Sequence, residues 1–366
     1  MSLFQVGIVG YGKMGQHHAK AFSFTGEAEI LAVVDPVESL RRQAYTAYGC
    51  ATFTSIEDMF AQIKELDIVV IATHSPLHHK QTLAALFAGC HVLCEKPMAD
   101  SLQECDDMVN VARLRGLKLA IHHQSVFSRA YATARQMIVE REIGEAYLFR
   151  AFGKGRFAGS DAKEIGGHLA HGIYCLAGGK VTEVYGDVTY QGRPITYEDA
   201  RPILELCPDG RDSGIGAGDR MIGHWKFNNG IRAEIQLALV DNSPLTYNED
   251  RSRSFGYYIE VFGTKGRLQW YLPHTLLRNH SPSDDWAKGR TPWEEVNPDF
   301  SNDKDPHLTQ LFIKNFLYAI KKDREPLVSG REGRIAMEMI LGISRSHLTG
   351  MPLAIPLGDR RHPFER

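Results

Sequence analysis

A glycine-rich turn, Gly10-Tyr11-Gly12-Lys13-Met14-Gly15, follows the apolar run at residues 6–9 and opens a helical pattern. In this Gly-x-Gly-x-x-Gly spacing, the first glycine permits a tight turn, the second lets the backbone approach a pyrophosphate, and the third lets helix and strand pack closely. Unpaired N–H groups and the positive end of the helix dipole then favour an anion at the helix start. The stretch therefore predicts a dinucleotide-binding strand–turn–helix unit.

An acidic residue, Asp35, ends the next apolar run. A carboxylate at the end of the second strand accepts hydrogen bonds from ribose hydroxyls and repels a 2′-phosphate. We therefore expect the cofactor to be NAD and not NADP. The cofactor contacts predicted from these two segments are Gly10, Tyr11, Gly12, Lys13, Met14, Gly15 and Asp35.

The composition is that of a two-domain protein with a nearly neutral surface. The 366 residues exceed the size of a typical single core. The 42 basic and 44 acidic residues nearly cancel, so we expect neither a nucleic-acid partner nor a membrane partner. The apolar runs are too short to span a bilayer and no leader pattern precedes the first strand, which favours a cytoplasmic protein. The six cysteines form no CxxC pair, so we expect no disulfide and no cysteine zinc site.

Buried-strand and amphipathic-helix patterns alternate through residues 1–123. The apolar runs lie at residues 30–34, 68–72, 91–94 and 117–121. This rhythm is typical of a doubly wound parallel sheet. We therefore expect an α/β protein whose first domain, residues 1–123, is an NAD-binding Rossmann domain.

Residues 124–366 show a different pattern, with longer strands of period-two alternation. Asn229-Gly230 separates two such strands and predicts a hairpin, because both residues tolerate positive φ. We expect an α+β domain here, with a large, mostly antiparallel open sheet that serves substrate binding and oligomerisation. A short helix is predicted near residues 168–176.

The C-terminal part of the chain has two further helical patterns, and two long stretches elsewhere have no regular pattern. Helical patterns at residues 308–321 and 334–347 are expected to pack on the second sheet or back on the first domain. Residues 192–219 and 273–305 lack a regular pattern. Such stretches are lids or oligomer arms, or else plain surface loops.

Four segments together carry a resemblance to a known family. They are the glycine-rich turn, Ala72-Thr73-His74-Ser75-Pro76-Leu77-His78, Glu95-Lys96-Pro97 and Arg331-Glu332-Gly333-Arg334. Over nearly its whole length the chain resembles the glucose–fructose oxidoreductase, inositol dehydrogenase and rhizopine catabolism (Gfo/Idh/MocA) family of NAD(P)-dependent enzymes. The resemblance implies that Lys96 contacts substrate and cofactor and assists proton transfer, that Pro97 shapes the turn, and that Glu95 lines the nicotinamide site.

Other residues at the carboxyl edge of the first sheet are further cofactor candidates. Together with Glu95 and Lys96, these candidates are Thr73, His74, His78 and Gln124. Capping of its own helix is the alternative interpretation of His78. For Gln124 and the neighbouring His123, the alternative is that they are ordinary polar groups at a domain junction.

A lysine at this edge suits the oxidation of an alcohol. Hydride leaves a carbinol carbon for the nicotinamide while the hydroxyl proton goes to a positioned base, and an ammonium or amine stabilises the developing alkoxide. The pKa of a lysine falls when the group is desolvated or lies beside another cation. Lys96 is therefore the first catalytic candidate.

One segment departs from the family pattern. The family usually carries Gly-Gly-x-x-x-Asp-x-Gly-x-His, in which the aspartate contacts substrate and the histidine acts as acid or base. This chain reads Gly166-Gly167-His168-Leu169-Ala170-His171-Gly172-Ile173-Tyr174. When the two are aligned on Gly172, Ala170 stands in place of the aspartate and Tyr174 in place of the histidine. Three interpretations stay open: Tyr174 takes over proton transfer, His171 reaches the same hydroxyl, or the reaction is not a simple alcohol oxidation.

The same segment contains an HxxH pair, His168 and His171. No third ligand follows at a suitable spacing, so we expect no metal. The substrate candidates of the chain are Lys96, His123, Arg156, His168, His171 and Tyr174. Their hydrogen-bonding groups suit a hydroxyl-rich, carbohydrate-like substrate, although a charged surface loop around Arg156 would look the same in sequence.

The leading hypothesis is an NAD-dependent oxidoreductase that acts on a secondary hydroxyl of a sugar, polyol or glycoside. A second is a redox-neutral, NAD-dependent glycoside hydrolase or epimerase, and a third is a non-catalytic sugar or dinucleotide sensor. We also expect oligomerisation, because an open sheet needs one face covered, and the resemblance implies a homodimer or homotetramer formed through this sheet.

Overall fold

The structure is a computed structural model that describes residues 3–155, 161–203, 214–239, 257–280, 292–296 and 307–365. The chain folds into two compact units. The first consists of Met1–His123 and Asp305–Arg334, and the second of Gln124–Lys304 and Ile335–Arg366. No described helix is both long enough and apolar enough to cross a membrane.

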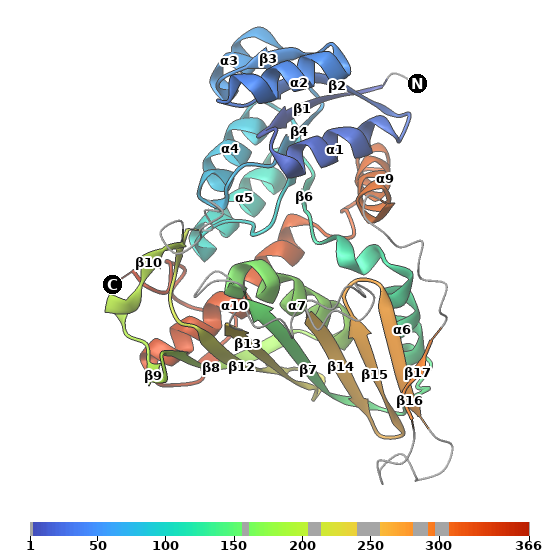
Figure 1. The fold of residues 1–366 in the computed structure, drawn as a ribbon, viewed down its shortest axis with the longest axis vertical. Helices are drawn as coiled ribbons and strands as arrows, with labels where there is room; N and C mark the ends of the chain where they lie inside the picture. The colour runs from blue at the N-terminus through green and yellow to red at the C-terminus, as the bar shows by residue number, and fades with distance from the viewer. Residues whose placement is uncertain are drawn as a thin grey trace. The chain divides into compact units, whose positions relative to one another are not determined.

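The first unit is built on a six-stranded parallel sheet (Figure 1). Its strands are β1 (Phe4–Val9), β2 (Ala28–Val34), β3 (Ala51–Phe53), β4 (Ile68–Ile71), β5 (His91–Cys94) and β6 (Leu119–Ile121). They lie in the order β3-β2-β1-β4-β5-β6, with parallel pairing throughout. Both faces of such a sheet are covered, which is why β4 is apolar and buried along its whole length. The order confirms the predicted doubly wound sheet.

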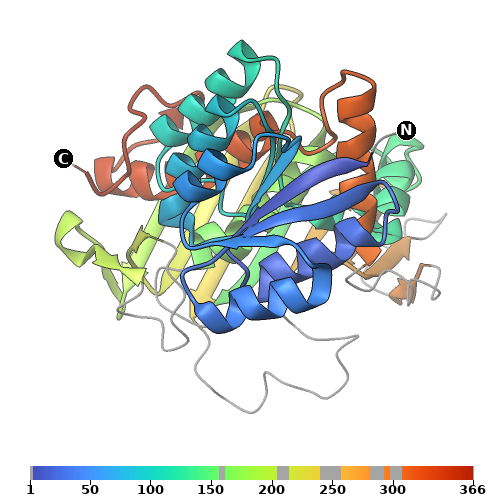
Figure 2. The same ribbon diagram turned by 90° about the horizontal axis from the view of Figure 1, so that it is seen from above.

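Helices cover this sheet on both faces (Figure 2). They are α1 (Lys13–Ser23), α2 (Glu38–Tyr48), α3 (Ile56–Gln62), α4 (Ser75–Phe87), α5 (Leu102–Leu114) and α9 (His307–Lys321). Helix α9 packs beside α1 although it comes from late in the chain. The start of α10 (Gly330–Thr349) meets β6, where a Cβ on Gly333 would lie only 2.5 Å from Ile121 Cγ1. Late segments of the chain therefore complete the first unit.

The second unit is built on a ten-stranded sheet (Figure 1). Its path is β17-β16-β15-β14-β7-β13-β12-β8-β18, and β9 pairs with β8. The described pairings are antiparallel except for the parallel neighbours β7 and β13. The strands are β7 (Ala146–Gly155), β8 (Val181–Tyr190), β9 (Arg193–Pro194), β12 (Arg220–Phe227), β13 (Arg232–Leu239), β14 (Tyr257–Gly263), β15 (Gly266–Tyr271), β16 (Thr275–His280), β17 (Glu294–Glu295) and β18 (Leu353–Ala354), with β10 (Arg201–Pro202) and β11 (Ile215–Gly216) as a separate pair.

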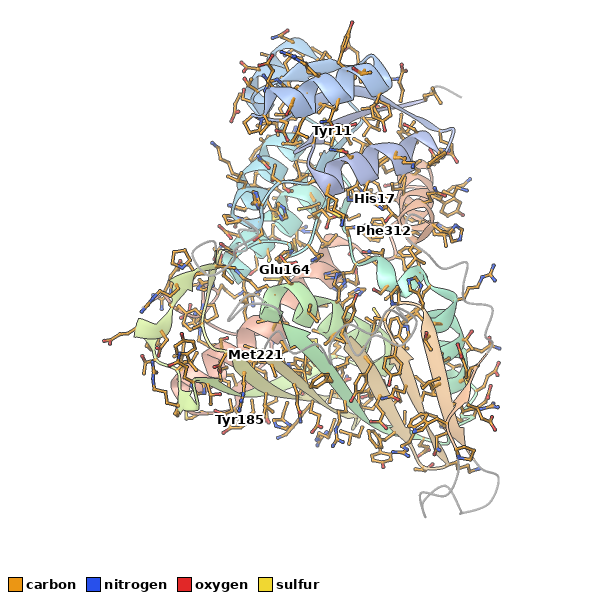
Figure 3. The ribbon with its side chains drawn as sticks, in the orientation of Figure 1. Tyr11, His17, Glu164, Tyr185, Met221 and Phe312 are labelled. Atoms are coloured by element: carbon orange, nitrogen blue, oxygen red, sulfur yellow. The ribbon has the colours of Figure 1, made fainter. Side chains whose placement is uncertain are left out.

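One face of this second sheet is covered by helices. The helical elements of the unit are η1 (Gln124–Phe127), α6 (Arg129–Val139), α7 (Asp161–Ala177), η2 (Tyr197–Asp199) and most of α10. Trp225 on β12 is buried, and its Nε1–H donates to the Met339 carbonyl of α10 at 3.2 Å. On the opposite face Ile222 is exposed. Tyr185 is exposed on the same face and is labelled in Figure 3. The alternation of buried and exposed residues along β12 follows from this one-sided cover.

Two predictions for the second unit were wrong in part. The short helix near residues 168–176 is a longer helix, α7, which begins at Asp161. The stretch at 273–305 contains β16 and β17, and the stretch at 192–219 contains β9, η2, β10 and β11. Strand β16 reads Thr-Leu-Leu-Arg-Asn-His, which has no apolar alternation, so its pairing with β15 gives it a strand conformation that its local pattern did not indicate.

Candidate functional site

Two glycines of the glycine-rich turn are required by the packing of the chain itself. Gly10 has φ +86°, and a Cβ there would lie 2.7 Å from the Ala72 carbonyl oxygen. A Cβ on Gly15 would lie 1.9 Å from the Gly10 carbonyl oxygen. Side chains at these positions would displace backbone. The turn therefore has the tight geometry that its sequence predicted.

Gly12 differs from these two glycines. It caps α1 with φ −67°, a conformation open to any residue, and a Cβ there would meet nothing within 4 Å. No side chain caps this helix start. The chain itself gives no reason for a glycine here, whereas close approach of a pyrophosphate to the first N–H groups of α1 does. This open cradle fits a dinucleotide.

Asp35 is fixed beside the same turn. Its Oδ2 accepts the Tyr11 N–H at 2.8 Å, and its Oδ1 accepts the Val37 N–H at 2.8 Å. Each carboxylate oxygen has two lone pairs, so each keeps acceptor capacity for a ribose hydroxyl. The negative charge lies at the end of β2, as the expected choice of NAD requires.

The turns after β4 and β5 are tied together by His78. Its Nδ1 lies 2.8 Å from the Pro97 carbonyl oxygen, and its Nε2 lies 3.0 Å from that of Thr73. Thr73 Oγ1 in turn donates to Gln81 Oε1 at 2.6 Å. His78 is buried, whereas His74 at the start of α4 is exposed. The structure thus brings Thr73, His78 and Pro97 together and leaves His74 toward solvent.

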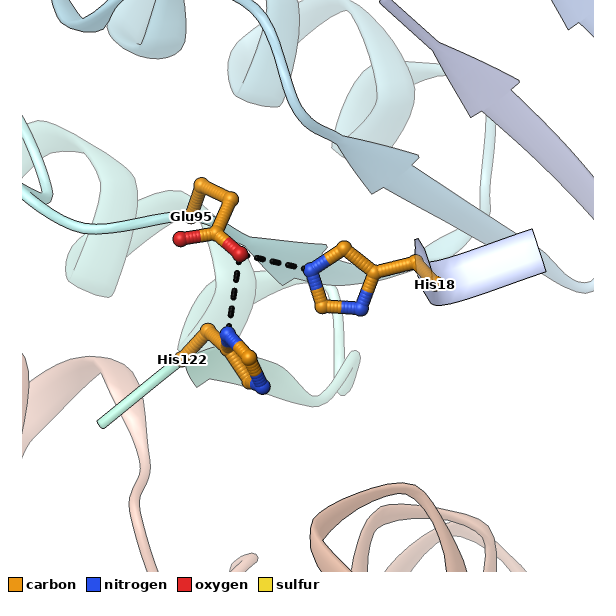
Figure 4. Close-up of side chains that lie close together, drawn as sticks. All are labelled: His18, Glu95 and His122. Carbon is orange, nitrogen blue, oxygen red and sulfur yellow. Dashed lines mark hydrogen bonds and ion pairs between the residues drawn. The ribbon is translucent and has the colours of Figure 1, made fainter. Parts of the chain in front are cut away.

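Glu95, the residue that precedes Lys96 in the chain, forms a buried cluster with two histidines. Glu95 Oε1 accepts hydrogen bonds from His18 Nε2 at 2.7 Å and from His122 Nδ1 at 2.8 Å (Figure 4). Glu95 Oε2 accepts the backbone N–H of Lys96 at 3.1 Å. Glu95 is 5% exposed, and both histidines are at most 1% exposed. Three N–H donors therefore converge on one buried carboxylate.

Helix α9 extends this cluster. Thr309 Oγ1 lies 3.2 Å from His122 Nε2 and 2.9 Å from His17 Nε2. Phe312, one turn further along α9, packs edge-on against His122 with 5.0 Å between ring centroids. Figure 3 labels His17 and Phe312 on α1 and α9, respectively. Four elements of the first unit, α1, β5, β6 and α9, thus supply the cluster.

The charge states follow from burial and hydrogen bonding. Burial and the neighbouring His122 lower the pKa of His18 to about 4, against the opposing effect of Glu95. His18 is therefore neutral near pH 7. Burial alone would raise the pKa of Glu95, but His122 and His18 outweigh it and hold that pKa well below its ordinary value. The cluster is a buried carboxylate anion held by imidazole N–H groups.

The ligand atoms of His18, Glu95 and His122 lie within 4.8 Å of one another, a spacing that metal ions also use. However, both imidazoles approach the same oxygen, Glu95 Oε1, at hydrogen-bond distance. An N–H proton occupies each of these short contacts. Hydrogen bonding therefore accounts for this arrangement of the three side chains.

In the second unit, α7 carries the segment that departs from the family pattern. Ala170 is fully buried, and His171 is buried with its Nε2 3.5 Å from Cys175 Sγ. Burial lowers the pKa of His171 to about 4. A Cβ on Gly172 would lie 2.7 Å from Ile259 Cδ1, so this glycine serves the packing of α7 on β14. Tyr174 is half-buried on the same helix.

The other predicted site residues are distributed over both units. His123 is buried at the end of the first unit, and Gln124 starts η1 in the second. Lys13 is exposed, Met14 and Lys96 are half-buried, and so is His168 on α7. Arg156 lies outside the described residues.

His17, His18, His122 and Thr309 are not among the site residues predicted from the sequence. Two of them could have been predicted to be buried polar residues. His18 occupies a buried position of α1, and His122 directly follows the buried strand β6. A polar residue in an otherwise apolar stripe indicates a buried partner. Nothing near Thr309 in the sequence indicated its contact with residues of α1 and β6.

The buried neutral histidines should make the stability of the fold depend on pH. His18 and His171 have an ordinary pKa of 6.5 and a folded-state pKa of about 4. Their contribution to stability is complete above pH 6.5 and is lost as the pH falls toward 4, because the unfolded chain binds the protons first. We expect the melting temperature to fall by roughly 5 °C or more between pH 7 and pH 5. Thermal melts between pH 7 and pH 5 measure this change. A melting temperature that does not change with pH would contradict the neutral state of His18 and His171, and His171→Asn should make the melting temperature less dependent on pH.

Comparison with known proteins gives consistent matches. Residues 4–123 match the GFO_IDH_MocA family model, described as an oxidoreductase family with an NAD-binding Rossmann fold. A 1,5-anhydro-D-fructose reductase of Ensifer adhaerens is 39% identical over 328 residues, which cover 83% of this chain and 84% of that protein. A 2,7-anhydro-N-acetylneuraminate hydratase of Escherichia coli (strain K12) is 27% identical over 262 residues, which cover 66% of this chain and 69% of that protein.

The fold also matches solved structures. A levoglucosan dehydrogenase in complex with NADH aligns with a TM-score of 0.77 at 18% identity, covering 97% of this chain and 100% of that one. This likeness, at such low identity, concerns the fold.

Proposed function

Because the chain belongs to the Gfo/Idh/MocA family of NAD-binding oxidoreductases, we propose that it transfers a hydride between NAD and a secondary hydroxyl of a sugar, polyol or glycoside. The position of Lys96 in the first unit is the main support for this proposal. Lys96 follows β5 at the carboxyl edge of the same parallel sheet as the glycine-rich turn. Ligands of doubly wound sheets bind at that edge.

The chain supplies cofactor binding, orientation and charge. NAD, when bound, accepts the hydride. Gly12 and the start of α1 hold the pyrophosphate, and Asp35 accepts hydrogen bonds from the ribose. Thr73, His74, His78, Glu95 and Gln124 complete the proposed cofactor set.

Lys96 acts at the substrate hydroxyl in this proposal. As an ammonium it stabilises the developing alkoxide, and as an amine it accepts the hydroxyl proton. Its backbone is held by Glu95, so its side chain starts from a fixed turn. His123, Arg156 and His168 are proposed to contact the other hydroxyls of the substrate.

The partner of Lys96 in proton transfer is His171 or Tyr174, and burial favours Tyr174. His171 is 1% exposed and its pKa is about 4, which makes it a weak base at neutral pH. Tyr174 is half-buried on the next turn of the same helix. We propose that Tyr174 exchanges the proton and that His171 supports the packing of α7.

A redox-neutral reaction is the second candidate. Two observations favour it: Ala170 occupies the place of the family's usual substrate-binding aspartate, and one relative is named a hydratase. In such a reaction, oxidation of a ring hydroxyl to a ketone acidifies the C–H bond on the neighbouring carbon. Loss of this proton and of a leaving group on the next carbon gives an unsaturated ketone, water adds in place of the leaving group, and the hydride returns to the ketone. NAD is then regenerated in each cycle.

We also propose a homodimer or homotetramer formed through the face of the second sheet that the described helices do not cover. Phe152 and Tyr258 pack against each other there, and Tyr185 and Ile222 are exposed on it. A one-sided sheet with exposed apolar groups is stabilised by a second copy. Light scattering in solution measures the assembly.

The function is tested with purified protein and a panel of polyols, glycosides and anhydro sugars. We expect saturable NAD binding by calorimetry, and NADH that accumulates in equal amount with product. The panel is also run in reverse with NADH and the matching ketones. Product without net NADH would favour the redox-neutral candidate, and absence of NAD binding would contradict both.

A further inference from the structure

A buried hydrogen-bond chain joins helix α9 to the turn of Lys96. It runs from His17 to Thr309 at 2.9 Å, from Thr309 to His122 at 3.2 Å, and from His122 to Glu95 at 2.8 Å. Glu95 then accepts the Lys96 N–H at 3.1 Å. Thr309 is fully buried. A hydroxyl on α9 is thus three hydrogen bonds away from the backbone of Lys96.

With His122 as a neutral imidazole, the chemistry of the groups sets the direction of each bond. An ionised carboxylate only accepts, so His122 donates its Nδ1–H to Glu95. A neutral imidazole has one N–H, so His122 Nε2 accepts the hydroxyl proton of Thr309. The Thr309 oxygen then accepts the Nε2–H of His17. Every bond in the chain points toward Glu95.

This polarity is suited to holding a charge and not to releasing a proton. A proton leaving the site would travel from Glu95 toward His17, against the direction of every bond. Glu95 also binds a proton poorly, since its pKa is held well below the ordinary value by His122 and His18 against the effect of burial. The chain therefore keeps the Glu95 carboxylate ionised and in place.

We propose that Thr309 is a positioning residue for Lys96. The Glu95 carboxylate sets the Nδ1–H tautomer of His122, and the Thr309 hydroxyl binds the remaining Nε2 and so holds the ring in place. The carboxylate bound to this ring in turn holds the Lys96 backbone. The inference rests on the proposed role of Lys96 in the reaction. It adds that the activity depends on a hydroxyl of α9 that contacts neither cofactor nor substrate.

Two variants separate this role from simple packing. Thr309→Val keeps the side-chain shape and removes the hydroxyl, whereas Thr309→Ser keeps the hydroxyl and removes a methyl. We expect Thr309→Val to lower kcat roughly ten- to hundredfold, with NAD affinity within about threefold of wild type, because a small displacement of a catalytic group has effects of this size. Thr309→Ser should keep kcat within about threefold. Equal losses in both variants, or none in Thr309→Val, would overturn the proposal.

Nitrogen NMR of the histidine rings gives a readout that needs no turnover. In NAD-loaded wild-type protein near pH 7.5, His122 should be a neutral Nδ1–H tautomer whose Nε2 accepts a hydrogen bond, and Thr309→Val should move the Nε2 resonance toward that of an imine nitrogen without a hydrogen bond. A cationic His122 in wild type, or an unchanged Nε2 resonance in Thr309→Val, would contradict the proposal. If the Nε2 resonance shifts but no wild-type substrate is found, the proposed function has failed and not the hydrogen-bond chain.

Discussion

Replacement of Gly12 by alanine should weaken NAD binding roughly 5- to 150-fold without changing the melting temperature. A Cβ at Gly12 meets nothing within 4 Å in the protein, and its φ of −67° suits alanine. The new methyl group would therefore act only on a ligand that approaches the backbone there. An overpacked contact costs about 1–3 kcal/mol, which corresponds to that range of affinity. Calorimetric titration with NAD and a thermal melt measure the two effects.

Two other glycines provide the controls. A Cβ on Gly358 would also meet nothing within 4 Å, but this glycine lies in the second unit, so Gly358→Ala should leave both NAD affinity and melting temperature unchanged. Gly15→Ala should lower the melting temperature, because its Cβ would lie 1.9 Å from the Gly10 carbonyl oxygen. Unchanged NAD affinity in Gly12→Ala would show that the pyrophosphate does not lie against this turn.

Replacement of Lys96 by alanine should lower kcat by about two to four orders of magnitude, with NAD affinity changed by less than about threefold. Removal of a positioned acid–base group has effects of this size. The Lys96 backbone would still donate to Glu95, so the turn itself should persist. Stopped-flow measurement of NADH formation and a separate NAD titration distinguish the chemical step from binding.

A second substitution separates charge from proton transfer. Lys96→Arg retains a positive charge but offers no group that can deprotonate. If Lys96 accepts the proton, this variant should be as slow as Lys96→Ala; if Lys96 only stabilises the alkoxide, it should retain part of the rate. Lys80→Ala is the matched control, because Lys80 is an exposed lysine of the same unit. Full turnover in Lys96→Ala would remove Lys96 from the mechanism.

Local sequence was sufficient for the first unit and its cofactor. The strands of a doubly wound sheet are buried on both faces, so each appears as a continuous apolar run that can be recognised by itself. The glycines at positions 10 and 15 are fixed by steric contacts within a few residues or with the adjacent turn after β4. Such features depend on near neighbours, which is why the fold class and NAD were predicted correctly.

The second unit was harder to predict because its strands obtain their conformation from their partners. Strand β16 has no apolar alternation of its own and is defined by pairing with β15. Helix α7 extends to Asp161, beyond the glycine pair at which the family pattern begins. Strand propensity is weak and depends on the packing environment, so these boundaries did not follow from the local pattern.

The pattern of residues was enough to predict a dinucleotide turn, an acidic residue for the ribose and a lysine after β5. What holds that lysine is visible only in the folded chain. Thr309 lies 187 residues from His122 in the chain, yet their side chains form a hydrogen bond. A contact of this kind leaves no periodic signal, because it depends on α9 folding back beside α1. The direction of the hydrogen bonds toward Glu95 became apparent only when all four elements were placed together.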